Sequence, residues 1–250
     1  MKTRTLKLLA FLISTTFFSG KVFGQAAQAD SAVFQASLDK QISNYYIAIG
    51  QQSRLYSGKE YYYYDRVIKG TPLFPLNVQS WETGEVTYDG FKYQGVPMMY
   101  DIYQDIVVVL LYNHFSMYSL INDKVKDFSF SGHHFVRINI DTIPNDKSGL
   151  TTGFYEQLYA GKCQVVARHA KTIQHNASVE NSLETYFLEA HDYFLRKGKT
   201  WYKVNSQGAL FSVLKDKKPA LQKYLKDHNL VFNDNPELAL SLLAAYYDRL

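Results

Sequence analysis

Residues 84–93 read Gly-Glu-Val-Thr-Tyr-Asp-Gly-Phe-Lys-Tyr, and this stretch indicates the fold. Two short runs, Glu85–Tyr88 and Phe91–Tyr93, contain β-branched and aromatic residues and lie on either side of Asp89 and Gly90. Gly90 can supply the positive φ that a tight turn needs. Runs joined by so short a turn pair antiparallel, because a parallel return requires a long crossover. The stretch therefore predicts two neighbouring antiparallel strands.

The same alternation of strand-forming runs and Gly or Asp turns continues over much of the chain. Aromatic residues make up 16% of the sequence, with 21 Tyr, and these residues favour half-buried sheet surfaces. The further expected strands are Glu60–Tyr64, Val96–Ile102, Ile106–Leu111, Phe115–Ile121, Val125–Phe130, His134–Ile140, Phe154–Tyr159, Cys163–Thr172, Tyr186–Ala190 and a final hairpin around Lys197-Gly198-Lys199. We expect one antiparallel β-meander over residues 55–204.

Helical patterns lie on either side of this region. One apolar stripe with spacings of three and four predicts a helix over residues 31–49; its members are Phe34, Leu38, Ile42, Tyr45 and Ile49. Asn235-Pro236-Glu237 is typical of a helix start, and residues 206–250 predict two to three helices. The expected fold is a single α+β domain over residues 25–250. Its extended antiparallel β-meander forms a curved sheet or half-barrel with an N-terminal helix and C-terminal helices.

The first 24 residues have the pattern of an export signal. Lys2, Arg4 and Lys7 precede an apolar stretch from Leu8 to Phe18, and Gln25 follows small or permissive residues. The stretch is too short to span a bilayer as a helix. We therefore expect a protein that is exported to the periplasm or outside the cell, with no transmembrane segment after cleavage.

Charge and cysteine content exclude some classes of function. The predicted signal holds four basic residues and no acid, so 23 of the 27 Lys and Arg remain against 23 Asp and Glu. This balance gives no reason to expect a nucleic-acid partner. Cys163 is the single cysteine, so no intramolecular disulfide forms. It is either a small strand residue or a nucleophile, and the second role needs an activating base that the sequence does not place nearby.

The run Tyr61-Tyr62-Tyr63-Tyr64 is the candidate binding site. On a strand, Tyr61 and Tyr63 would face one side while Tyr62 and Tyr64 face the other. One side is expected to pack on the core. The other is either also structural or an aromatic surface for a carbohydrate, a small apolar ligand or a partner protein, because tyrosine combines apolar area with a polar tip.

The sequence predicts no catalytic residues, no metal-binding residues and no cofactor. His133 and His134 are adjacent on an expected strand and point to opposite faces, so they cannot both bind one ion. His169 and His175 fall across an expected strand end, and His191 is isolated. Acids also lie in the strand region, but their sequence positions place no catalytic pair; those considered are Asp101, Asp105, Asp141, Glu156, Glu184 and Glu189. The common hydrolase and phosphate-binding motifs are absent.

Seven segments follow one another along the chain: Leu55–Tyr61, Lys69–Phe74, Gly84–Gly90, Val96–Asp101, Gly153–Gly161, Lys223–Lys226 and Tyr246–Asp248. In this order they resemble a family of exported bacterial proteins of uncharacterised function. The resemblance covers nearly the whole mature chain and implies an envelope or secreted location, but no activity. A looser similarity, at the level of a curved sheet with a helix, is to periplasmic lipoprotein-carrier half-barrels.

Three functions fit these patterns. The first is a non-catalytic exported protein that binds a partner or ligand through its antiparallel sheet. The second is a periplasmic carrier that encloses an apolar ligand in a half-barrel cavity, which would need a continuous apolar cavity. The third is a hydrolase with no recognisable motif, which would need titratable groups that converge in a cleft.

Overall fold

A computed structural model describes residues 24–49, 54–75, 81–177 and 183–250. The chain divides into two compact units, Met1–Ile49 and Gly50–Leu250, and each is described by itself. The predicted signal peptide, apart from Gly24, lies outside the described residues. The prediction that residues 25–250 form one domain stays a prediction.

The first unit contains the helix α2, Gly24–Ile49. It includes the whole predicted helix over residues 31–49 and begins earlier, at Gly24. The earlier start has a local reason, because Gln25, Ala26, Ala27, Gln28 and Ala29 favour helix and none of them breaks it.

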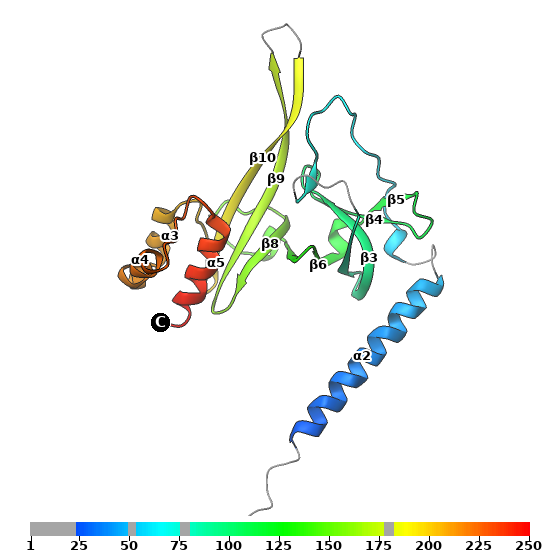
Figure 1. Cartoon of the computed structure of the whole chain (residues 1–250), viewed down its shortest axis with the longest axis horizontal. Coiled ribbons are helices and arrows are strands. Elements are labelled where there is room, and N and C mark those ends of the chain that lie inside the picture. Colours follow the sequence, from blue (N-terminus) through cyan, green and yellow to red (C-terminus); the bar gives the residue numbers. More distant parts are fainter. Residues whose placement is uncertain (1–23, 50–53, 76–80, 178–182) are drawn as a thin grey trace, which may run out of the picture. The chain divides into compact units, whose positions relative to one another are not determined.

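The second unit is built on an eleven-stranded antiparallel sheet that is open and curved (Figure 1). Its strands are β1 Leu73–Phe74, β2 Glu82–Tyr88, β3 Phe91–Asp101, β4 Ile106–Leu110, β5 Met117–Ser119, β6 Val125–Phe130, β7 His133–Ile138, β8 Gly153–Ala160, β9 Cys163–Ala177, β10 Leu183–Lys197 and β11 Thr200–Lys203. Three helices follow: α3 Gln207–Val213, α4 Lys218–Asp227 and α5 Pro236–Tyr247. The predicted α+β class is confirmed.

The strand order is not that of one continuous meander. The order along the sheet is β11-β10-β9-β8-β7-β6-β2-β3-β4-β5, with β1 beside β3. Strands β1–β5 therefore form a first half and strands β6–β11 a second half, and pairing of β2 with β6 joins them. Strand β2 has a register shift on each side, between Gly84 and Glu85 in its pairing with β3 and between Thr87 and Tyr88 in its pairing with β6. Such bulges bend a strand and increase its twist, which accounts for part of the curvature.

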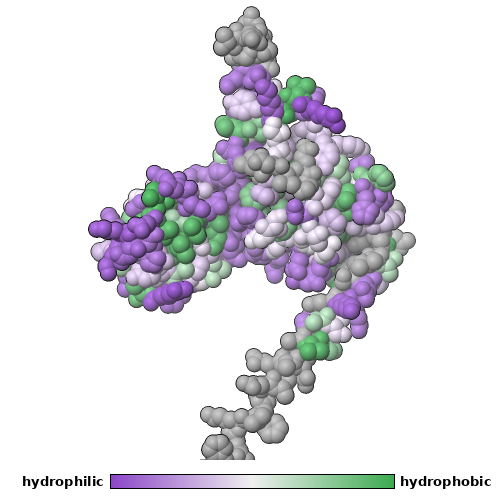
Figure 2. Space-filling model, viewed as in Figure 1, coloured by the Kyte–Doolittle hydropathy of each residue, from purple (hydrophilic) through white to green (hydrophobic). Residues whose placement is uncertain are grey.

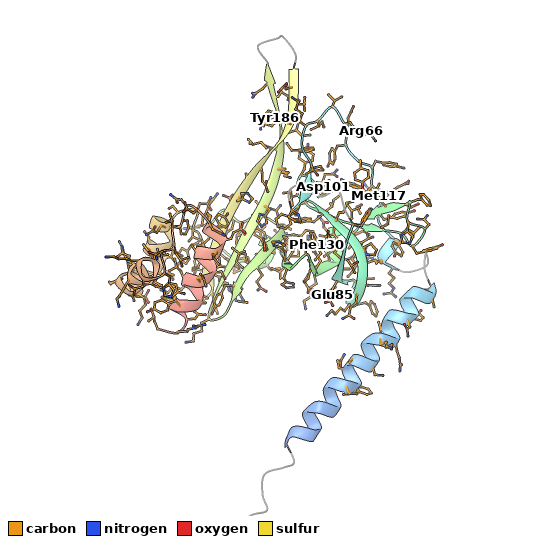
Figure 3. All side chains as sticks on the ribbon, in the orientation of Figure 1. Arg66, Glu85, Asp101, Met117, Phe130 and Tyr186 are labelled. Carbon is orange, nitrogen blue, oxygen red and sulfur yellow. The ribbon has the colours of Figure 1, made fainter. Side chains whose placement is uncertain are left out.

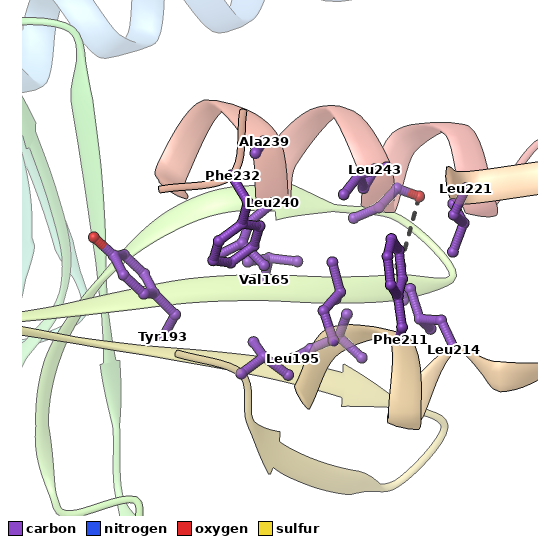
Figure 4. Packing of buried hydrophobic residues seen from close by; sticks show 14 of the residues in the cluster. Val165, Tyr193, Leu195, Phe211, Leu214, Leu221, Phe232, Ala239, Leu240 and Leu243 are labelled. Carbon is purple, nitrogen blue, oxygen red and sulfur yellow. Dashed lines mark hydrogen bonds between the residues drawn. The ribbon is translucent and has the colours of Figure 1, made fainter. Parts of the chain in front are cut away.

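The C-terminal helices cover one face of the second half. Helix α5 contacts β8 and β9, and Figure 4 shows the strand residues facing the helical ones. The residues at this contact are apolar and almost completely buried. They include Val165, Leu195, Leu210, Phe211, Leu214, Leu221, Phe232, Leu240 and Leu243. Helix α5 begins as predicted, because the Asn235 side chain accepts a hydrogen bond from the Leu238 N–H over 3.0 Å.

An aromatic core fills the region where the two halves meet. Tyr100 on β3 contacts Phe128 on β6, Phe135 on β7 and Phe154 on β8, with ring centroids 5.1–6.1 Å apart. All four rings are fully buried. Met98 and Ile102, on either side of Tyr100 in the chain, are also buried.

The surface is mixed in character. Hydrophilic and hydrophobic residues alternate over the face in Figure 2, and the hydrophobic ones gather in small separate patches. One such patch lies over the C-terminal helical region. Among the described helices, none is both long and apolar enough to cross a membrane.

Candidate functional site

The four consecutive tyrosines do not form a strand. Only Glu60 of the expected strand Glu60–Tyr64 makes a β-bridge, to Tyr118, and the tyrosines follow an irregular path. The alternation prediction is therefore wrong: Tyr61 is buried, Tyr62 and Tyr63 are exposed at 70% and 46%, and Tyr64 is half-buried. Local composition favours a strand here, but the segment leaves the sheet edge and crosses over to β10.

A buried carboxylate sets this path. Both Tyr61 and Tyr64 donate their hydroxyl hydrogen bonds to Oδ2 of Asp101, over 3.0 and 2.9 Å. The other carboxylate oxygen of Asp101 accepts from the backbone N–H groups of Tyr103 and Gln104. Burial raises the pKa of Asp101 against the opposing effect of these hydrogen bonds. Tyr61 and Tyr64 are thus anchored, whereas Tyr62 and Tyr63 remain on the surface.

The crossing segment forms one wall of a pocket of about 540 Å³. We call it the Tyr63 pocket; its lining residues are 63–66, 68–70, 72 and Phe187 of β10. Lys69 holds the segment to β10, because its N–H donates to the Thr185 carbonyl and its carbonyl accepts from the Phe187 N–H. Figure 3 shows Arg66 on this segment and Tyr186 on the neighbouring strand.

The Tyr63 pocket combines aromatic and charged side chains. The Tyr64 ring packs edge-on against Phe187, with 5.4 Å between ring centroids. Asp65, Arg66 and Lys69 supply polar groups at the same pocket. Two of the four predicted site residues, Tyr63 and Tyr64, therefore line a pocket. Tyr61 and Tyr62 are not among its lining residues.

A second site brings together histidines and acids that the sequence did not connect. We call it the histidine–carboxylate cluster; it consists of His133, Glu156, His169, His191 and Glu237. His133 on β7 and His169 on β9 bind the two oxygens of Glu156 on β8, over 2.6 and 2.7 Å. His134 instead contacts Ser129 over 2.7 Å. The two adjacent histidines therefore have separate partners.

Electrostatics define the state of Glu156. Burial by itself would raise the pKa of Glu156, but the hydrogen bonds from His133 and His169 outweigh it and lower the pKa to about 2. The hydrogen bond between His133 and Glu156 also raises the pKa of His133. Glu156 is therefore an acceptor-only carboxylate, and both histidines donate to it.

His191 is not isolated, which corrects the prediction. The β9–β10 register places His169 directly opposite His191, and their Nδ1 atoms are 2.9 Å apart. Glu237 in the first turn of α5 completes a group of three donor atoms, from His169, His191 and Glu237, that all lie within 4.8 Å of one another. His175, expected beyond the strand end, lies on β9 and contacts Thr185 over 3.0 Å.

Long strands explain why the cluster was missed. The first predicted strand ends at Thr172 and the next begins at Tyr186. In the structure β9 continues to Ala177, and β10 already begins at Leu183. A hairpin centred near residue 180 would have placed His169 opposite His191. Nothing in the local sequence links either histidine to Glu237, which lies in α5, after β11, α3 and α4.

Comparison of the chain with protein-family models, with curated proteins and with solved structures found no match. The two sites are therefore interpreted from their own geometry.

Proposed function

We propose that this protein is exported and acts as a non-catalytic binding protein, with a small carbohydrate bound in the Tyr63 pocket. The observation that carries the proposal is the pocket of about 540 Å³ that Tyr63, Tyr64 and Phe187 line together. Small-molecule sites commonly have volumes of about 300–1,000 Å³ and combine aromatic walls with a few polar groups.

The mixture of groups favours a carbohydrate over an apolar ligand. A sugar has an apolar face that can pack on Tyr63, together with hydroxyl groups that can bind Asp65 and Arg66. An apolar ligand would remove those charged side chains from water without replacing their hydrogen bonds, which is costly. Because the predicted mature chain has balanced charge, nucleic acid is not the proposed ligand.

Calorimetry with a panel of neutral and acidic oligosaccharides tests the proposal on the mature chain. We expect Tyr63→Ala and Arg66→Ala each to weaken binding about tenfold or more, equivalent to about 1.4 kcal/mol. Tyr62→Ala is the matched control, because Tyr62 is an exposed neighbour that is not among the lining residues. Unchanged affinity in both pocket variants, or an equal loss in the control, would contradict this site.

Mass spectrometry of molecules that co-purify with the protein separates the other function classes. A bound lipid would favour the carrier. Turnover of model ester or glycoside substrates would favour a hydrolase, for which the histidine–carboxylate cluster supplies converging titratable groups.

Export is tested separately. Intact mass or N-terminal sequencing of the protein recovered outside the cytoplasm is expected to give a start at or near Gln25. An uncleaved chain in the cytoplasm would contradict export without bearing on the pocket.

A further inference from the structure

The facing histidines of β9 and β10 each have an acid near Nε2. Nε2 of His169 lies 2.7 Å from Oε2 of Glu156, and Nε2 of His191 lies 3.6 Å from Oε1 of Glu189. The Glu156 carboxylate favours the tautomer of His169 with its proton on Nε2, whereas Glu189 lies beyond hydrogen-bond distance of His191. In that tautomer Nδ1 of His169 carries a lone pair, which faces Nδ1 of His191 across 2.9 Å.

Without an ion, His191 can donate its Nδ1–H to this lone pair; with its proton on Nε2 instead, His191 presents a second lone pair that an ion can share. A carboxylate hydrogen-bonded to the far nitrogen of an imidazole is the usual second contact of a metal-binding histidine, because it orients the ring and raises its basicity. Here His169 makes this contact with Glu156, and on the opposite residue of the strand pair Glu189 lies 3.6 Å from Nε2 of His191. The geometry therefore favours a cation shared by His169 and His191.

Glu237 adds a negatively charged donor to the two imidazoles. It lies in the first turn of α5, which Asn235 caps, and its Oε1 is 3.4 Å from the hydroxyl of Tyr193. The three donor atoms lie within 4.8 Å of one another. Movement of the Glu237 side chain toward the histidines would bring the three donor atoms to metal bonds of about 2.0–2.2 Å.

The surroundings suit a bound ion that exchanges with solvent. The His169 ring is buried against Phe74, with 4.6 Å between ring centroids, whereas 38% of the His191 side chain is exposed. Glu156 and Glu189 add negative charge next to the two histidines. This set of nitrogen and oxygen donors is typical of Zn²⁺ and its neighbours in the first transition series, not of Ca²⁺ or Mg²⁺.

We infer that His169, His191 and Glu237 bind one divalent transition-metal ion, with Zn²⁺ as the representative ion and a coordination position left open to solvent. This site is separate from the Tyr63 pocket and does not depend on the proposed carbohydrate. It adds a metal-binding function to the second half of the sheet.

Titration of the tag-free mature protein with Zn²⁺ by calorimetry, and with Co²⁺ by absorption spectroscopy, tests the inference. We expect one ion per chain and Co²⁺ bands of a low-coordinate site. His191→Gln and Glu237→Gln, both at partly exposed positions, are each expected to weaken binding at least about tenfold, since each removes a ligand. Circular dichroism of the metal-free variants verifies that they are folded.

His175→Gln is the matched control, because His175 also lies on β9 but contacts Thr185 on an exposed part of the strand. It is expected to bind as the unaltered protein does. Glu189→Gln provides a graded test, with a smaller loss expected because Glu189 acts through His191. The inference is overturned by the absence of stoichiometric binding, by full affinity in either ligand variant, or by an equal loss in the His175 control.

Discussion

Arg168 on β9 donates to Asp105 in the turn between β3 and β4, with 2.9 Å between Nη2 and Oδ2. This ion pair joins the two halves of the sheet, and both side chains are largely buried. Asp105 also accepts from the Tyr100 hydroxyl over 2.6 Å, and Arg168 Nη1 donates to the Phe154 carbonyl over 2.9 Å. The pair is therefore fully integrated in a hydrogen-bond network at the centre of the fold.

Removal of one partner of this ion pair should be strongly destabilising. Asp105→Ala leaves the Arg168 charge buried and unpaired, so we expect the free energy of unfolding to fall by about 3–5 kcal/mol. Asp123→Ala is the control: it breaks the ion pair with Arg137, but Asp123 is 84% exposed, and the expected change is about 0–1 kcal/mol. Urea denaturation measures both, and similar small losses would contradict the central role of Arg168 and Asp105.

Two glycine substitutions should have opposite effects. A methyl group at Gly153 would overlap the Arg168 guanidinium and the Asp105 carboxylate, so Gly153→Ala is expected to cost about 1–3 kcal/mol. In α3, a methyl group at Gly208 would meet its nearest atom, Ser206 Oγ, only at 4.0 Å. Gly208→Ala should therefore stabilise by up to about 1 kcal/mol through helix propensity. Thermal denaturation compares the two, and the same sign for both would refute this account.

Two tyrosine truncations separate core from surface. Tyr100 is buried among three phenylalanine rings, so Tyr100→Ala should lower the free energy of unfolding by about 3–5 kcal/mol. Tyr62→Ala should change it by about 0.5 kcal/mol or less, because the ring is exposed. A large loss for Tyr62→Ala in chemical denaturation would mean that Tyr62 is covered in the folded protein.

Cys163 should be unreactive in the folded protein. Burial, together with a contribution from Asp248, raises the pKa of its thiol to about 12, so the thiolate is nearly absent until the pH approaches that value. We expect a disulfide reagent at about pH 8 to label Cys163 very slowly in the native state and rapidly in denaturant, because the unfolded thiol has a pKa of about 8.5. Rapid labelling of the native protein would instead support a role for Cys163 as a nucleophile, which the burial of its thiol argues against.

Local patterns predicted the elements that depend on neighbouring residues. The turn at Asp89 and Gly90 has positive φ at both residues, and Gly198 has it in the β10–β11 hairpin. The Asn235 cap starts α5 where expected. In each case the signal and the structure it specifies lie within a few residues of each other, so no distant contact is needed to produce them.

Elements that depend on distant partners were not predictable in this way. The expected strand Glu60–Tyr64 is absent because Asp101 binds the hydroxyls of Tyr61 and Tyr64, and that carboxylate is about 40 residues away in sequence. The pairing of β2 with β6 likewise depends on which edge of the first hairpin becomes covered. Alternation specifies a strand and its faces, but it does not specify the neighbouring strand.

The sequence by itself determined the α+β class, the antiparallel character of the sheet and the positions of most turns and helix starts, because these follow from side-chain periodicity and local backbone preferences. Only the tertiary structure decided which polar groups meet. His169 and His191 are 22 residues apart and face each other through the β9–β10 register, and Glu237 reaches them because α5 packs on β8 and β9. Register and helix packing are properties of the whole core, so both candidate sites emerge only when the sheet has formed.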